Sequence, residues 1–233
     1  MPAAKVATRE EWLAARKALL AKEEHTHVRD ALNRERLALP WVKVEKRYVF
    51  EGADGKETLA DLFGPRSQLV IKHFMFAPDW EEGCLGCSFE VDHVGGALAH
   101  LEHHDVSYLA VSRAPWPKIA AYQQRMGWQF KWVSSHGSDF NYDFHASFPK
   151  NGDANGKVFS NFEVRDFEIE DVSGRSAFYK DEKGDVFHTY SGFERGNEEV
   201  LGTYMLLDLT PKGRNEKGPR HNLTDWVRRH DEY

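Results

Sequence analysis

The chain has 233 residues, 41% of them hydrophobic, so it is long enough to bury a substantial core, which argues against a disordered or fibrous protein. Its formal net charge of -6 argues against a nucleic-acid-binding protein, because no net positive field is present to displace phosphate counterions. No apolar run approaches the roughly 20 residues that cross a bilayer, and residues 1–11 lack the apolar core of a secretory signal, so we expect a cytoplasmic protein with no nucleic-acid or membrane partner.

The first 40 residues are predicted to form a helical extension. Thr8 and Glu11 have the spacing of a capping box, and apolar residues follow them at near-helical intervals. The pattern predicts two helices, or one helix that is broken near His25. We assign residues 1–40 to this extension and residues 41–233 to the main domain. Two roles fit the extension, dimerisation or capping of a sheet.

The main domain is predicted to begin with a hairpin, followed by a buried strand. Residues 48–50 and 58–59 flank a turn-forming segment at 53–55. Residues 69–71 and 74–76 then form a nearly continuous apolar run. Such a run is typical of a strand that is covered on both faces in a parallel sheet.

A helix and a second strand are predicted to complete a βαβ unit. Apolar residues recur at helical spacing over 88–104, and 106–111 is a second buried strand. Pro115 begins another helix, which Gly127 ends, and a strand follows at 130–133.

The last third of the chain is predicted to add a hairpin, a helix and a tail. Residues 177–179 and 186–190 read as the two strands of the hairpin, and 198–206 as the helix. The polar segment 211–220 is expected to wrap the surface until the segment around Trp226 packs back.

The two cysteines, Cys84 and Cys87, lie between the first buried strand and the predicted helix of the βαβ unit. A Cys-x-x-Cys motif in that place has the arrangement that thiol–disulfide exchange needs. Backbone N–H groups at a helix N-terminus favour the thiolate, so Cys84 is the predicted nucleophile. Cys87, one turn later, is predicted to be more buried and to resolve a mixed disulfide.

Other side chains near the motif are expected to tune it. Asp79, Glu81 and Glu82 precede Cys84, and their charges would oppose thiolate formation if they lay close to it. Trp80 would either screen the thiol from water or pack in the core.

Histidines near the motif suggest a metal site as an alternative, because thiolates and imidazoles together bind zinc or copper. If one helix spans 88–104, however, His93, His100 and His104 form a stripe on the opposite side from Cys84, so we expect a solvated face and no metal ligand. His73 could approach the dithiol, but we favour a core histidine.

The segment from His73 to Phe89 resembles a thioredoxin-like family, domain-of-unknown-function family 899, whose members are described as predicted dithiol-disulfide oxidoreductases. Residues 110–115, 125–128, 138–144 and 208–214 look like further signature segments of that family. The resemblance implies an α/β, thioredoxin-like fold of the peroxiredoxin style. It would have a mixed central sheet flanked by helices and an N-terminal helical extension.

The sequence departs from that family and fold at two places. Leu85-Gly86 stands where similar sequences often carry a proline between the cysteines, and no proline occurs between Pro149 and Pro211 to face the dithiol. Residues 174–176 are predicted to take that facing position instead. An arginine there resembles peroxiredoxins, so Arg175 is a candidate to steady the thiolate.

Arg113 is a further candidate, because it ends a predicted parallel strand at the edge where open α/β sheets place their sites. A surface salt bridge is the interpretation that we favour for it.

The leading hypothesis is a thiol–disulfide oxidoreductase, which acts on a protein or small-molecule disulfide and is restored by a cellular thiol reductant. The alternatives are a non-catalytic thioredoxin-like binding module, a peroxiredoxin-like thiol peroxidase, and a Cys/His metal-carrying protein. Neither a Walker loop nor a dinucleotide fingerprint is present, so no cofactor is expected.

Overall fold

The computed structural model describes residues 6–23, 25–214 and 216–233. Contacts divide the chain into two compact units, of which the first ends at Pro40 and the second is Trp41–Tyr233. None of the helices in the described ranges combines the length and the apolarity that a membrane crossing requires.

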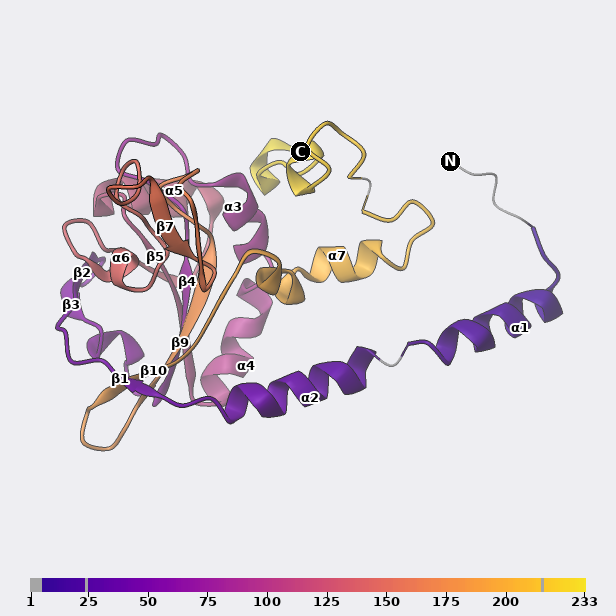
Figure 1. Cartoon of the computed structure of the whole chain (residues 1–233), viewed down its shortest axis with the longest axis horizontal. Helices are drawn as coiled ribbons and strands as arrows, with labels where there is room; N and C mark the ends of the chain where they lie inside the picture. The colour runs from indigo at the N-terminus through magenta and orange to yellow at the C-terminus, as the bar shows by residue number, and fades with distance from the viewer. Residues whose placement is uncertain (1–5, 24, 215) are drawn as a thin grey trace. The chain divides into compact units, whose positions relative to one another are not determined.

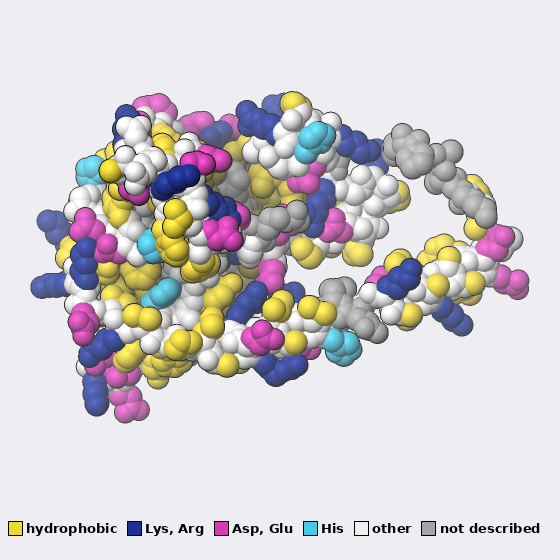
Figure 2. All heavy atoms as spheres, viewed as in Figure 1, with side chains coloured by type: hydrophobic (Ala, Val, Ile, Leu, Met, Phe, Trp, Pro, Cys, Tyr) yellow, Lys and Arg dark blue, Asp and Glu magenta, His cyan; other side chains and the backbone are white. Residues whose placement is uncertain are grey.

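The first unit consists of two helices, α1 (Arg9–Leu20) and α2 (His25–Leu37) (Figure 1). The predicted break near His25 and the predicted capping box at Thr8 are both confirmed. Helix α1 buries none of its side chains. Figure 2 shows hydrophobic side chains along both helices, and the exposed ones include Trp12, Leu20 and Val28.

The second unit is built on an eight-stranded mixed sheet. In spatial order its strands are β1 (Val42–Lys43), β10 (Val186–Phe193), β9 (Gly174–Lys180), β4 (Gln68–His73), β5 (Val106–Ser112), β6 (Lys131–Ser134), β2 (Val49–Gly52) and β3 (Gly55–Thr58). Strands β4, β5 and β6 are parallel to one another, whereas β9 pairs antiparallel with β4 and β2 pairs antiparallel with β6. A separate hairpin joins β7 (Lys157–Ser160) and β8 (Glu163–Asp166).

Helices connect several of the strands, and further helices follow the last strand. The α-helices are α3 (Leu85–Val91), α4 (Leu98–His103), α5 (Trp116–Met126), α6 (Phe140–Asp143) and α7 (Gly202–Leu207). The 3-10 helices are η1 (Asp61–Phe63), η2 (Gly95–Ala97), η3 (Glu194–Val200), η4 (Leu223–Asp225) and η5 (His230–Glu232).

The order of these elements confirms the expected thioredoxin-like, peroxiredoxin-style fold, a mixed central sheet flanked by helices. Strand β4 enters the dithiol loop, α3 and α4 return the chain to β5, and α5 returns it to β6. The β9–β10 hairpin then covers the other side of β4. The predicted hairpins and the C-cap glycine, Gly127 with φ of 64°, are also confirmed.

Residues of β4 alternate between the two faces of the sheet, as the period of a strand requires, and a separate hydrophobic core lies on each face. Leu69 and Ile71 belong to a cluster with Phe140 and Phe178 on one face. Cys87 belongs to a second cluster, with Phe74, Phe76 and Trp132, on the other face. The dithiol therefore lies on the α3 face of the sheet.

Two predicted helices and one predicted strand need correction. The expected helix over 88–104 is two α-helices, since α3 ends at Val91 and α4 begins at Leu98, and the segment between them contains two poor helix formers, Gly95 and Gly96. The expected helix over 198–206 is a 3-10 helix followed by α7. Residues 74–76 leave the ladder after β4, because they curve into the dithiol loop.

Candidate functional site

Cys84 is the N-cap residue of α3, as its spacing predicted. Its backbone N–H donates to the carbonyl of Met75 at 3.0 Å, which ties the loop to the chain that leaves β4. The preceding Gly83 packs so closely that a Cβ there would lie 2.7 Å from Phe74 and 2.8 Å from Tyr122. Glycine at this position therefore lets the loop lie flat against the core and fixes the place of the thiol.

The surroundings of the Cys84 sulfur favour the thiolate. The backbone N–H of Cys87 donates to Sγ of Cys84 at 3.5 Å. The Cys87 thiol hydrogen bond, this backbone N–H, the charge of Lys72 and the N–H of Gly86 together lower the pKa of Cys84 to about 6, against the effect of burial. Since the thiolate is the nucleophile, Cys84 is suited to attack at neutral pH.

Cys87 has the opposite properties. Its side chain is only 1% exposed, and burial first, then the neighbouring Cys84, raises its pKa well above the ordinary value. Both thiols are free. The pair thus combines a half-buried acidic thiol with a fully buried protonated one, the division that the sequence predicted.

A buried ionic group lies beside the dithiol on the α3 face, and sequence analysis missed it. Nζ of Lys72, on β4, lies 2.6 Å from Oε2 of Glu90, on α3, and 2.5 Å from Oγ of Ser173. Arg175, on β9, reaches the other oxygen of Glu90 at 2.5 Å. Lys72 is fully buried and Glu90 is 4% exposed, so these charges act on the thiols with little screening by water.

The guanidinium of Arg175 binds Glu90 and Asn197. Besides Glu90 it contacts Oδ1 of Asn197 at 3.2 Å and the Asn197 carbonyl at 3.3 Å. The cation among the main influences on the pKa of Cys84 is Lys72. A direct role of Arg175 on the thiolate stays a prediction.

Of the acidic residues before Cys84, which would oppose the thiolate if they lay close to it, the two glutamates are paired with basic side chains. Glu82 is paired with Arg125 at 2.5 Å and with Arg229 at 2.9 Å, and Glu81 lies 3.5 Å from Lys118. These cations offset the negative charges, and no carboxylate is among the main influences on the pKa of Cys84.

Trp80 and Arg113 lie in different surroundings. Trp80 and Cys84 are both partly buried against the cluster that contains Cys87, so screening of the thiol by Trp80 stays a prediction. Arg113 forms a two-pronged ion pair with Asp171, at 2.8 and 2.9 Å, and contacts the Tyr142 hydroxyl at 3.1 Å. The expected surface salt bridge of Arg113 is therefore a partly buried one, because Asp171 is 5% exposed.

The C-terminal segment covers the start of α3, which Figure 1 shows in yellow beside that helix. Arg229 donates to the Gly83 carbonyl at 3.1 Å and to the Tyr122 hydroxyl at 2.8 Å. Leu223 lies over Gly86, where a Cβ would be 3.5 Å from it. The expected return of the Trp226 segment is confirmed by ring contact between Trp226 and Phe89, at 5.7 Å between centroids.

The histidines near the motif are dispersed. His93 bonds to the hydroxyl of Thr203 at 2.7 Å, so its assignment to a solvated stripe is wrong, whereas His100 and His104 are exposed. The stripe fails because α3 and α4 are separate helices. Within the described ranges, no three His, Cys, Asp or Glu side chains gather closely enough to hold a metal ion.

His73 is a core histidine, as favoured from the sequence. It lies on the face of the sheet opposite Cys87, where its ring stacks on Phe140 at 5.7 Å. Its Nε2 contacts Oγ of Ser176 at 2.7 Å, and burial lowers its pKa to about 3.

Comparison with known proteins gives one family match over the whole chain. The model of a bacterial protein of unknown function, DUF899, matches residues 1–233. No curated protein matches.

Solved structures give more distant similarities. A mutant of peroxiredoxin Q from Xanthomonas campestris is 14% identical, with a TM-score of 0.44 over 68% of this chain and 90% of that chain. The putative thiol:disulfide interchange protein DsbE from Chlorobium tepidum is also 14% identical, with a TM-score of 0.42 over 74% of this chain and 99% of that one. Peroxidoxin BcpB from Mycobacterium tuberculosis is 14% identical, with a TM-score of 0.44 over 71% and 95%.

Proposed function

The chain belongs to the bacterial family of unknown function DUF899, and we propose that it is a thiol–disulfide oxidoreductase whose reactive dithiol is Cys84 and Cys87. The observation that carries this proposal is the contrast between the two thiols. Cys84 caps α3 with a lowered pKa, and Cys87 is buried with a raised one. Cys84 is therefore suited to attack a substrate disulfide, and Cys87 to resolve the mixed disulfide that follows.

The reaction begins with attack by the Cys84 thiolate on one sulfur of a substrate disulfide. A mixed disulfide forms between Cys84 and that sulfur, and the other half of the substrate leaves as a thiolate, which takes up a proton. Cys87 then loses its proton and attacks the Cys84 sulfur. The second half of the substrate leaves, and the Cys84–Cys87 disulfide remains. A cellular thiol reductant restores the dithiol by the same steps in reverse.

The neighbours of the dithiol support both steps. The charge of Lys72 lowers the pKa of both thiols, which favours the first nucleophile and eases deprotonation of the second. Burial first, then Cys84 and to a smaller extent Glu90, raise the pKa of Cys87, which keeps that thiol protonated before a mixed disulfide forms. Leu223 and Arg229 border the dithiol loop, where they would restrict the size of the substrate that reaches Cys84.

Trapping of the mixed disulfide tests this proposal. The Cys87→Ser variant lacks the resolving thiol, so oxidised glutathione near pH 7 should leave one glutathionyl group on Cys84, seen by mass spectrometry of the digested protein. The Cys84→Ser variant is the matched control and should gain little. Absence of an adduct in folded Cys87→Ser, or equal adducts in the two variants, would contradict the assigned roles.

A further inference from the structure

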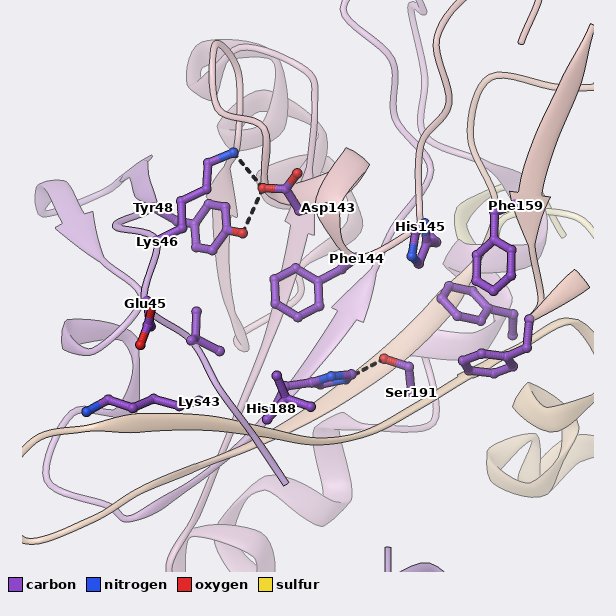
Figure 3. Close-up of a pocket in the computed structure, with 14 residues that line it drawn as sticks. Lys43, Glu45, Lys46, Tyr48, Asp143, Phe144, His145, Phe159, His188 and Ser191 are labelled. Atoms are coloured by element: carbon purple, nitrogen blue, oxygen red, sulfur yellow. Dashed lines mark hydrogen bonds and ion pairs between the residues drawn. The ribbon is translucent and has the colours of Figure 1, made fainter. Parts of the chain in front are cut away.

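A cavity lies on the face of the sheet opposite Cys87. Its volume is about 400 Å³, within the range of pockets that bind small molecules. Figure 3 shows Phe144, His145 and Phe159 along one side and His188 with Ser191 along the other. The rings of Tyr48, Phe162 and Phe193 also line it. Aromatic side chains, the two histidines included, therefore make up half of the 14 residues of its wall.

The floor of the cavity carries a chain of hydrogen bonds that runs into the core. Nε2 of His188 lies 2.8 Å from Oγ of Ser191, which lies 2.8 Å from Oγ of Ser176, which in turn lies 2.7 Å from Nε2 of His73. Ser176 and His73 are fully buried. These hydrogen bonds, which run from His188 to the buried His73, hold the ring of His188 in one orientation.

The hydrogen bonds also define which nitrogen of His188 is free to accept. Nε2 lies 3.0 Å from the carbonyl of Tyr190, and because a carbonyl can only accept, Nε2 must carry the hydrogen. Burial lowers the pKa of His188, so the ring is neutral at pH 7 and Nδ1 is an acceptor. None of the described residues bonds to Nδ1 of His188. His188, a residue of the cavity wall, thus carries one acceptor that has no donor among the described residues.

Three residues at or beside the cavity have a left-handed backbone conformation. His145, Asn161 and Phe162 have φ of 53°, 49° and 66°, a region that costs free energy for residues other than glycine. The strained Phe162 is 60% exposed. Its hairpin is fixed to the end of β10, because Asn161 donates to Glu194 at 3.1 Å. Strain of this kind, with an exposed ring over a cavity, is typical of ligand sites.

Charges around the cavity are balanced. Two basic and two acidic side chains line it, Lys43, Lys46, Glu45 and Asp143. Lys43 is paired with Asp185, and Lys46 with Asp143, both at 2.6 Å. Because the lysines are already paired, the cavity does not favour an anionic ligand.

We propose that this cavity binds a neutral phenolic compound, whose ring packs among Phe144, Phe159 and Phe162 and whose hydroxyl donates to Nδ1 of His188. The planar ring of the ligand matches the aromatic side chains of the wall, and its hydroxyl matches the free acceptor. The site is separate from the dithiol, since it lies on the other face of the sheet.

The test is titration calorimetry of the full chain with 2-naphthol and with 2-methoxynaphthalene, a close analogue that cannot donate. We expect 2-naphthol to bind about tenfold more tightly, the value of one hydrogen bond to a desolvated acceptor. The His188→Phe variant should bind the two compounds equally. No measurable binding of 2-naphthol to the folded protein, or equal binding of both compounds to the unaltered chain, would overturn the proposal.

Substitutions at two exposed positions of the β7–β8 hairpin test where the site lies. Phe162→Ser should weaken 2-naphthol binding about tenfold, because it removes one aromatic wall. Val164→Ser is the matched control, since Val164 is 71% exposed on the hairpin and does not line the cavity, and it should bind as the unaltered chain does. Cys84→Ser should also leave binding unchanged. Equal affinity of the Phe162 and Val164 variants would overturn the location.

Discussion

At the scale of single residues, the acidity of Cys84 comes from its donors. The Cys87 thiol, two backbone N–H groups and Lys72 all act on one sulfur. The rate of alkylation by iodoacetamide should therefore rise with pH through a midpoint near pH 6 and level off above it, because only the thiolate reacts. Cys87→Ala removes the strongest donor and should move the midpoint upward. A midpoint at the ordinary value of a cysteine, about 8.5, would contradict the geometry.

Lys72 offers a second test at this scale. In Lys72→Met the pKa of Cys84 should rise, since a positive charge is lost, and the alkylation midpoint should move to higher pH. Unfolding free energy should fall by up to about 3–5 kcal/mol, because Glu90 loses its fully buried partner at 2.6 Å and keeps only Arg175.

The double variant Lys72→Met/Glu90→Gln separates these two effects. It should recover part of the stability, measured by urea unfolding, because the Glu90 carboxylate is removed together with its lysine partner, while Arg175 keeps its two contacts to Asn197. An unchanged alkylation midpoint in folded Lys72→Met would show that the lysine does not act on the thiol.

The two cysteines, and which of them attacks first, could be predicted from the sequence, but their ionic neighbours could not. The spacing of Cys84 and Cys87 before a helix is a local pattern, so it could be recognised directly. Lys72 and Glu90 come together only when β4 and α3 pack. A signal existed, because Lys72 interrupts an apolar strand and Glu90 lies three positions after Cys87, within one turn.

At the scale of elements, the dithiol loop depends on a glycine before the first cysteine. Gly83→Ala would place a Cβ within 2.8 Å of two rings, so we expect a loss of about 1–3 kcal/mol in unfolding free energy. Gly86→Ala is the matched comparison, because its nearest contact would be an ordinary 3.5 Å. It lies in α3 and should be neutral or stabilising by up to about 1 kcal/mol. Equal losses in urea unfolding would contradict the packing described for Gly83.

The C-terminal segment should control access to the dithiol. Arg229→Gln removes the contacts to Gly83, Glu82 and Tyr122, so the segment should open more often and a bulky maleimide should modify Cys84 about tenfold faster. The neighbouring Arg228→Gln is the control, since the Arg228 side chain is exposed. Equal rates in the two variants would show that this segment does not cover the thiol.

The helix predicted over 88–104 was placed wrongly because its pattern does not show where α3 ends and α4 begins. The apolar residues over 88–104 keep helical spacing across Gly95-Gly96, so periodicity alone does not reveal the break. Tertiary contact decides it, because His93 turns to α7 and bonds to Thr203. Where the pattern and the caps agree, as in α1 and α5, the predicted helix is confirmed.

At the scale of the whole molecule, the alternation of strands and helices made the α/β class predictable. The resemblance of the residues around the dithiol made the thioredoxin-like arrangement predictable as well. The aromatic cavity was not, since its wall is assembled from segments more than 140 residues apart, such as those of Tyr48 and Ser191. No local pattern encodes such a site.

The most direct measurement is titration of the dithiol in glutathione redox buffers, with the Cys84–Cys87 disulfide followed by mass and Cys84→Ser as control. We predict a reversible intramolecular disulfide, with loss of both thiol hydrogens and a potential within about -270 to -120 mV, the span of thioredoxin-like dithiols. A folded protein whose two cysteines stay reduced in fully oxidising buffer would contradict the proposed exchange chemistry.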